Sequence, residues 1–350
     1  MKYELNVFNN YQQSIKKKRI ILLILSVVLV VLFFLSLLFN RGGLSVKDSL
    51  LTLFGIEKGE ASRLIIFNIR LSRSIGAVLI GFGLAISGLI MQINLRNPLA
   101  SPSTLGVSNS ALLGATISII IFNNKSVYTS SMLSTTPMAL LFAIISVIFL
   151  LFLSKIKNFS PSVVAVSGIA ITSLASALTT IIQYFASDTQ LASSVYFSFG
   201  DLSRTNYSAD LVLFIFILVS FIIFMFFSSK YNALYSGDEM AITLGVNINV
   251  VRLVSLFFAS MICAITVSFV GVIGFIGILA PHIMKRFIGN ESRYLIPCSG
   301  LLGAIILVFC DIISKVIIPN FALPVGAVTS IIGAPFFFFI LISKKENIHG

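Results

Sequence analysis

The sequence predicts an all-helical protein that crosses a membrane many times. Of its 350 residues, 57% are hydrophobic and only 10% are charged, and the mean hydropathy is +1.04. Soluble domains, by contrast, carry about 25% charged residues. Apolar stretches of about 20 residues, the length that spans a bilayer as a helix, recur along the chain. We therefore expect a single transmembrane domain over 20–342, with short tails at 1–19 and 343–350.

The first apolar stretch, 20–40, follows a basic cluster of Lys16, Lys17, Lys18 and Arg19. A signal peptide begins in the same way, but no small-residue cleavage site follows, and the stretch is as long as a full membrane span. A retained first helix is therefore expected. Because the cytosolic flanks of membrane helices are rich in Lys and Arg, the N-terminus is expected in the cytosol.

Nine further stretches complete an expected count of ten spans. Six are long and apolar, at 74–93, 134–154, 161–185, 208–227, 253–270 and 325–342. Three are shorter or interrupted by Gly and Pro, at 103–122, 272–290 and 295–318. An even number returns the C-terminus to the cytosol and places most Lys and Arg on the cytosolic side. The cations on the outer side are concentrated in the loop 41–73.

The stretch 74–93 is expected to lie inside the protein. Ala77, Gly81 and Ala85 recur every four residues, a pattern that lets transmembrane helices approach closely. The alternative for this pattern is helix packing with no role toward a substrate, and nothing in the sequence argues against it.

Three segments are interrupted by Gly and Pro at the edges of predicted spans. Pro98 and Pro102 interrupt the segment after 74–93, and similar interruptions occur at 271–289 and 319–335. Backbone groups that proline frees cannot face lipid, so the first segment is expected to be buried or to line a water-filled cavity. Interrupted helices in both halves of a chain are typical of transporters.

The polar loop 228–252 is expected to contain a short helix. Ser236 and Glu239 have the spacing of a capping box, and Gly245 suits the left-handed residue that ends a helix. About two turns lie between these signals, which is fewer than an isolated helix needs in water. The helix is therefore expected to depend on a partner surface.

This short helix has an apolar face and an acidic start. Met240 and Leu244 lie four residues apart, and Asp238 and Glu239 occupy the first turn, where the helix dipole favours negative charge. The chain contains no G-x-x-x-x-G-K-[ST] phosphate loop, so it cannot itself hydrolyse ATP in the usual way, and any energy input must come from another polypeptide.

The residues that nucleic-acid binding, metal binding or catalysis would require are not evident in this sequence. The cations are scattered among the spans or grouped at their ends, which does not favour nucleic acid. His282 and His349 have no second ligand at metal spacing, and Cys263, Cys298 and Cys310 lie in apolar surroundings without C-x-x-C spacing. We expect buried thiols and no metal or cofactor. Paired carboxylates or a serine with a base, as an enzyme would need, are not evident.

Asp311 is the one acid inside a predicted span, and Lys315 lies four residues later on the same face. A structural ion pair, or a position at the end of the helix, is the expected explanation. A proton relay is the alternative, because ionisable residues within membrane spans are frequently functional.

Seven motifs occur in order between about residues 60 and 342: Arg70-Leu71-Ser72-Arg73, GFGLAISGLIMQ, RNPLASPSTLGVSN, SGDEMAITLGV, GVIGFIGILAPHIMK, DIISK and LPVGAVTSIIGAPFF. Together they resemble the permease subunits of ABC importers for iron(III)-siderophores, haem and vitamin B12. The resemblance implies ten helices per subunit, a pair of permease subunits that is a homo- or heterodimer, two cytosolic ATPase subunits and an extracytoplasmic substrate-binding protein.

The resemblance also implies roles for individual residues. Coupling to the ATPase is implied for the helix between spans six and seven, with Gly237, Asp238, Glu239, Met240, Ala241, Leu244 and Gly245. Docking of the binding protein is implied for Arg70, Arg73 and Lys315, although relatives carry an arginine where Lys315 stands. Interfacial anchoring at a helix start is the alternative for Arg70 and Arg73. An inner gate is implied at Ser160, Pro161 and Ser162, and helix initiation is the alternative for Pro161.

The sequence therefore predicts a permease subunit, not an enzyme, that moves an iron(III)-siderophore-like ligand inward by alternating access. It is expected in the lipid of a bacterial plasma membrane, with both termini cytosolic. Haem or cobalamin is the alternative cargo. An ion-coupled secondary carrier that needs no ATPase is the alternative mechanism, although almost no charge lies near the midplane, where such carriers bind ions. The interrupted helices disfavour a purely structural scaffold.

Overall fold

The computed structural model describes residues 2–39, 46–53, 56, 59–122, 130–318 and 322–343. Within these residues all regular structure is helical: α1 (Lys2–Leu38), α2 (Val46–Leu53), α3 (Glu60–Leu64), the π-helical η1 (Ile65–Leu71), α4 (Ser72–Leu95), the 3₁₀ turn η2 (Ser103–Leu105), α5 (Val107–Ile120), α6 (Ser130–Ile156), α7 (Pro161–Tyr184), α8 (Asp188–Ser198), the 3₁₀ turn η3 (Leu202–Arg204), α9 (Tyr207–Phe226), α10 (Ser228–Tyr235), α11 (Asp238–Thr243), α12 (Ile248–Val270), α13 (Ile276–Ile288), α14 (Ser292–Val316) and α15 (Val325–Ser343). The predicted tail after Ser343, the cations Arg41 and Lys58 and the proline Pro319 lie outside the described residues.

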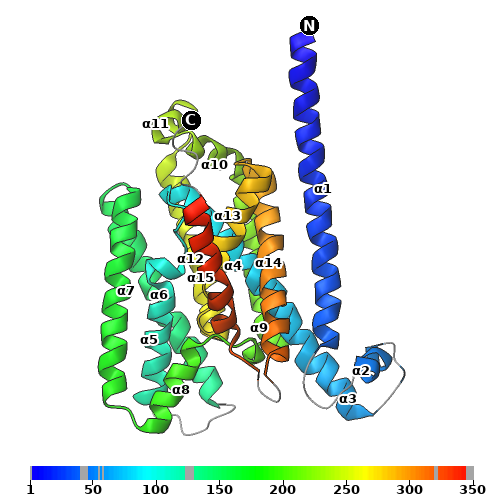
Figure 1. Ribbon diagram of the computed structural model, residues 1–350. Coiled ribbons are helices and arrows are strands. Elements are labelled where there is room, and N and C mark those ends of the chain that lie inside the picture. Colours follow the sequence, from blue (N-terminus) through cyan, green and yellow to red (C-terminus); the bar gives the residue numbers. More distant parts are fainter. Residues whose placement is uncertain are drawn as a thin grey trace.

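Figure 1 shows that the short helices gather at two opposite ends of the molecule. α10 and α11 lie at one end, which we call the α11 end, and α2, α3 and α8 lie at the other, which we call the α8 end. α1 begins and α15 ends at the α11 end. This arrangement agrees with an even number of crossings and with a polar loop 228–252 that lies on the same side as both ends of the predicted membrane domain.

Seven helical stretches of the described chain are long and apolar enough to cross a membrane: Gln12–Leu38, Glu60–Leu95, Thr135–Ile156, Pro161–Tyr184, Tyr207–Phe226, Ile248–Val270 and Ser292–Val316. α5 and the Val325–Phe336 part of α15 are shorter apolar helices. α13, at 13 residues, is shorter than the bilayer-spanning length of about 20 residues. The prediction of an all-helical, multi-pass membrane protein is confirmed.

Several elements extend beyond the predicted stretches. The expected tail 1–19 is helical from Lys2 and continuous with the first span, since no Gly or Pro interrupts Lys2–Leu38. The stretch predicted at 74–93 begins at Glu60, because α3, η1 and α4 join into one helix that ends at Leu95. The region expected as an outer loop, 186–210, contains α8. Ser187 and Gln190 form a capping box at the N-terminus of this helix.

α4 is the interior helix of the fold, as Ala77, Gly81 and Ala85 predict. Ala77 and Ala85 are fully buried, and so are the neighbouring Ile80 and Ile86. A Cβ at Gly81 would lie 2.5 Å from the carbonyl oxygen of Gly303, so the α4 and α14 backbones touch at this point. α4 packs against α9, α12, α13 and α14, so it lies at the centre of the bundle.

The segment after α4 is divided between solvent and core. α4 ends at Arg96, which adopts a left-handed conformation with φ 47°. Asn97, Pro98 and Leu99 are exposed, whereas the chain from Ala100 to Pro102 is buried. The first alternative, burial, therefore holds for 100–102 and not for 97–99, for which the second alternative, lining a water-filled cavity, stays a prediction. The exposed part begins beside α11, because Arg96 contacts Asp238.

Candidate functional site

α11 is a six-residue helix whose first residue is Asp238. Gly237 precedes it with φ 119°, and Gly245 follows it with φ 77°, so both glycines adopt conformations that other residues rarely take. The predicted stop at Gly245 agrees with this geometry. The predicted capping box is wrong, because Ser236 is the C-cap of α10, Gly237 is the N-cap of α11, and no side chain caps the first turn of α11.

α11 exposes most of its apolar side chains. Ala241 is fully buried and anchors the helix, but Met240, Ile242 and Leu244 are 53%, 62% and 64% exposed. Met240 and Leu244 were expected from the sequence to form an apolar face. Ile242 was not, because it lies two residues from each of them rather than three or four. We call these three residues the α11 patch.

α10 holds α11 against the body of the protein. The Tyr231 hydroxyl and the Ser255 hydroxyl of α12 are 2.8 Å apart and hydrogen-bonded, and the Asn232 side-chain oxygen accepts from the Ser292 N–H at 2.8 Å. Burial raises the pKa of the Tyr231 and Tyr235 phenols, so both stay protonated at any physiological pH. The hydrogen bonds of α10 to α12 and α14 therefore hold the helix that precedes α11 in place, although the α11 patch itself is exposed.

Asp238 binds two arginines. One carboxylate oxygen, Oδ1, accepts from Arg96 Nη2 at 2.6 Å and from Arg252 Nη2 at 2.9 Å, and Arg252 Nη2 also lies 3.1 Å from Oδ2. Arg96 is 43% exposed in its side chain, whereas that of Arg252 is 3% exposed. The α11 helix therefore begins on a carboxylate fixed from both sides, one of them buried. Arg96, Asp238, Glu239, Met240 and neighbouring residues line an open depression of about 550 Å³.

Arg252 also binds two backbone carbonyls of the interior. Its Nε donates to the Asn94 carbonyl oxygen at 3.1 Å, in the last turn of α4. Its Nη1 donates to the Phe159 carbonyl oxygen at 3.3 Å, immediately before α7. From the sequence, Arg252 is only one of the Lys and Arg residues expected on the cytosolic side. Its position at the first turn of a span, at the end of the polar loop, was the one signal available.

The predicted gate residues form the start of α7. Ser160 is the N-cap and Pro161 occupies the first helical position, as its fixed φ favours. The Ser160 and Ser162 hydroxyls are 3.1 Å apart. The helix-initiation role expected for Pro161 agrees with this geometry, and a gating role stays a prediction. The contact between Arg252 and Phe159 places this segment at the α11 end, next to Asp238.

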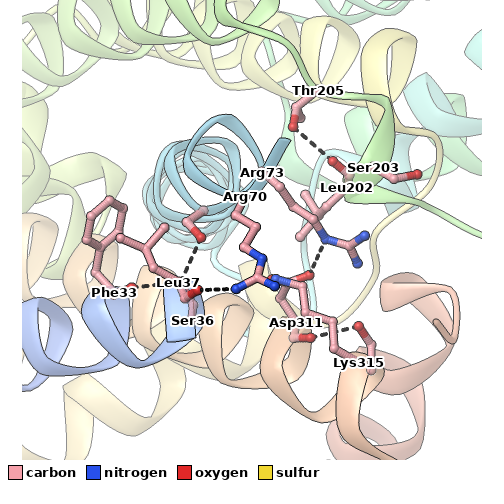
Figure 2. Close-up of polar contacts among 12 residues, drawn as sticks. Phe33, Ser36, Leu37, Arg70, Arg73, Leu202, Ser203, Thr205, Asp311 and Lys315 are labelled. Carbon is pink, nitrogen blue, oxygen red and sulfur yellow. Dashed lines mark hydrogen bonds and ion pairs between the residues drawn. The ribbon is translucent and has the colours of Figure 1, made fainter. Parts of the chain in front are cut away.

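The predicted docking residues lie elsewhere, toward the α8 end (Figure 1), because Arg70 contacts the last turn of α1 and Ser49 of α2. Figure 2 shows how their side chains lie. Arg73 Nε donates to Asp311 Oδ1 at 2.8 Å, and Lys315 Nζ lies 2.5 Å from Asp311 Oδ2. Arg70 Nη1 donates to the Leu37 carbonyl oxygen at 3.0 Å and to Ser49 Oγ at 2.8 Å. The expected pair of Asp311 and Lys315 is thus present, with Arg73 as its third member.

All three predicted docking cations are buried within the chain. The exposed fraction is 0% for Arg70, 7% for Arg73 and 1% for Lys315. Arg70 Nε and Nη2 and Arg73 Nη2 have no hydrogen-bond partner among the described residues. The sequence could not anticipate this burial, because it depends on α1, α2 and α14 covering the junction between η1 and α4. In this conformation the three side chains do not form an open surface.

No group of three or more His, Cys, Asp or Glu side chains that could hold a metal ion occurs in the part of the chain that the structure describes. Cys263, Cys298 and Cys310 are free and buried.

A family model described as the FecCD transport family matches residues 28–343. The chain belongs to this family. It is 39% identical to a putative ABC transporter permease protein of Methanocaldococcus jannaschii, over 87% of this chain and 89% of that protein. It is 37% identical to an Fe(3+)-citrate import system permease protein of Bacillus subtilis, over 79% of this chain and 81% of that protein. It is 33% identical to a hemin transport system permease protein of Yersinia pestis, over 89% and 92%.

A solved structure supports the same assignment. The structure described as an inward-facing conformation of a putative metal-chelate type ABC transporter has a TM-score of 0.81 and 27% identity, over 92% of this chain and 99% of that one. This FecCD-family chain is therefore an ABC transporter permease subunit and is not itself catalytic. Such permeases work with ATPase and binding-protein partners. Family membership decides against the secondary carrier that the sequence left open.

Proposed function

We propose that this FecCD-family permease moves an iron(III)-siderophore-like chelate inward by alternating access, driven by a separate ATPase. The observation that carries the mechanism is the α11 patch, an exposed apolar surface on a helix too short to stand alone. The cargo is proposed from the names of relatives, which include permeases for Fe(3+)-citrate and for hemin. Haem or cobalamin is the alternative cargo, and growth on a panel of these chelates after deletion of the gene would decide.

We propose that ten helices cross the membrane, namely the seven long apolar stretches together with α5, α13 and α15. The α11 end then faces the cytosol of a bacterial cell, because Lys16, Lys17, Lys18, Arg19, Lys230, Arg252, Lys285 and Arg286 all lie toward it. Two permease subunits, identical or different, would pair around the path, with two ATPases on the α11 ends and a binding protein on the α8 ends.

The α11 patch is proposed as the ATPase contact, with Gly237 and Gly245 setting its bounds. Leu244→Asp is expected to weaken capture of the ATPase by at least about tenfold, because it places a charge in the centre of an apolar contact. Co-purification of the ATPase with the permease in detergent measures this. Leu244→Met is the matched control, since it keeps an apolar side chain of similar volume. Equal retention of the ATPase by both variants would contradict the assignment.

Arg70, Arg73 and Lys315 are proposed as the residues on which the binding protein docks. A substitution that reverses their charge is not a suitable test. A buried Glu at these positions would damage the fold, because Asp311 already occupies the site. Arg70→Gln removes one charge without adding an anion. It is expected to weaken capture of the binding protein by about threefold to tenfold, with the larger loss at low salt.

The control for this test is Lys47→Gln together with Arg63→Gln, which neutralises two exposed cations near the α8 end. Capture is measured by surface plasmon resonance on permease in nanodiscs, and each variant is first checked for an unchanged melting temperature. If the control weakens capture and Arg70→Gln does not, docking depends on the exposed surface and the assignment to Arg70 is wrong.

A further inference from the structure

Arg252, at the α11 end, joins three separate segments of the chain. Each guanidinium nitrogen has a different partner: Nε the Asn94 carbonyl of α4, Nη1 the Phe159 carbonyl before α7, and Nη2 the Asp238 carboxylate of α11. The residue is 2% exposed, so its bonds to the two carbonyls are shielded from bulk water, whereas the Asp238 side chain is 34% exposed. A buried charged group holds such partners strongly, since losing one leaves it unsatisfied.

The planar guanidinium makes these three contacts depend on one another. Its nitrogens lie in a fixed fork, so a displacement of the Asp238 carboxylate tilts or translates the whole group. The other two contacts are to backbone atoms of α4 and of the turn before α7, which cannot rotate away as a side chain would. Movement at the start of α11 therefore reaches the Phe159 carbonyl through a single rigid group.

The segment that receives this movement is strained. Asn158 and Phe159 are consecutive residues with φ 50° and 54°, and Phe159 is 4% exposed. Asparagine tolerates this left-handed conformation, but phenylalanine adopts it at a cost. Strained backbone persists where the surroundings hold it in place, and such positions are frequent at switching sites. Arg252 is one of the groups that hold this turn, immediately before Ser160.

We propose that Arg252 is the positioning residue that transmits movement of α11 to the start of α7. The inference rests on the proposed function, in which α11 binds the ATPase and Ser160 to Ser162 form the inner gate. ATP-dependent displacement of Asp238 shifts the Arg252 guanidinium, and loss or rotation of its bond to Phe159 lets the 158–159 turn change conformation. Arg96 cannot do the same, because within the described residues its side chain bonds to Asp238 and not to the turn before α7, and it is 43% exposed.

The test uses the full-length permease co-purified with its ATPase and placed in nanodiscs. A spin label is attached through Ser162→Cys, an exposed position, while the three native cysteines are buried. The distance between the labels of the two permease subunits is measured with and without Mg-ATP. Arg252→Lys keeps the charge and loses the fork, and it is expected to reduce the ATP-dependent change at least about fivefold while the ATPase still co-purifies.

Arg96→Lys is the matched control and is expected to retain the change, because Arg252 still holds Asp238. Asp238→Asn is the second variant, which keeps both carbonyl contacts of Arg252 and weakens only the link to α11. A response of Arg252→Lys and Asp238→Asn equal to that of Arg96→Lys would overturn the proposal. If the labelled Ser162→Cys chain without any further substitution bound no ATPase or gave no ATP-dependent change, the proposed function itself would fail, and the inference with it.

Discussion

Replacing Gly88 by alanine is expected to prevent the protein from reaching its native packing. A Cβ at this position would lie 1.9 Å from the carbonyl oxygen of Gly277 and 2.5 Å from its carbonyl carbon and Cα. Because the obstructing atoms are backbone, no side-chain rotation relieves the overlap, and α4 and α13 must separate. Overpacking of a core typically costs about 1–3 kcal/mol. At such a close backbone contact we expect a loss at or above the upper end of this range.

The measurement is the yield of monodisperse protein in detergent and its melting temperature. Gly274→Ala is the control, because the nearest atom to its Cβ would be Ser330 Oγ at 3.8 Å, an ordinary contact distance. Gly274→Ala is expected to behave as the unsubstituted protein. The prediction for Gly88→Ala is wrong if both variants give the same yield and the same melting temperature.

The Gly88 contact illustrates what the sequence could and could not supply. Ala77, Gly81 and Ala85 identified α4 as an interior helix from their spacing alone, since small residues at every fourth position allow close approach. The partner of each small residue was not predictable. Gly88 meets Gly277 and Gly81 meets Gly303, both about 190 to 220 residues away in the chain, as the numbering shows. Contacts between helices so distant in sequence leave no local pattern.

The α11 site shows the same division. Gly245 marked the end of the helix correctly because a left-handed residue is a local requirement. Ser236 was wrongly predicted as the N-cap of α11 because it is the C-cap of α10, a helix for which the sequence carries no separate signal. Arg252 was missed because its role consists of contacts to Asn94, Phe159 and Asp238, which only the fold brings together.

The motifs in the sequence pick out the three predicted docking cations, but they do not show that these side chains are buried. Arg70 and Arg73 stand in a loop rich in cations, which reads as an outer surface. In the structure, α3, η1 and α4 form one helix, and the junction between η1 and α4 is covered by the end of α1 and by α2, as the bonds from Arg70 to Leu37 and Ser49 show. Hydropathy does not report such coverage, because α2 is a short amphipathic helix outside the spans.

Asp311→Ala is expected to destabilise the protein by about 3–5 kcal/mol, the cost of breaking a buried ion pair from one side. Asp311 is fully buried and is the only acid that the structure places against Arg73 and Lys315 within the described residues. Its removal leaves two buried cations without an anion, close to a third at Arg70 (Figure 2). Chemical unfolding in detergent, followed by circular dichroism, measures the loss.

Lys315→Met provides the comparison that assigns this cost to charge rather than to packing. It removes one cation, leaves Asp311 paired with Arg73 and keeps an apolar side chain of similar length, so a smaller loss is expected. The double variant Asp311→Ala with Lys315→Met should then be more stable than Asp311→Ala alone, because one of the two orphaned cations is gone. Coupling between neighbouring charged residues typically amounts to about 0.5–3 kcal/mol. Additive losses would show that the buried charges do not interact, and the ion pair would then be incidental to the fold.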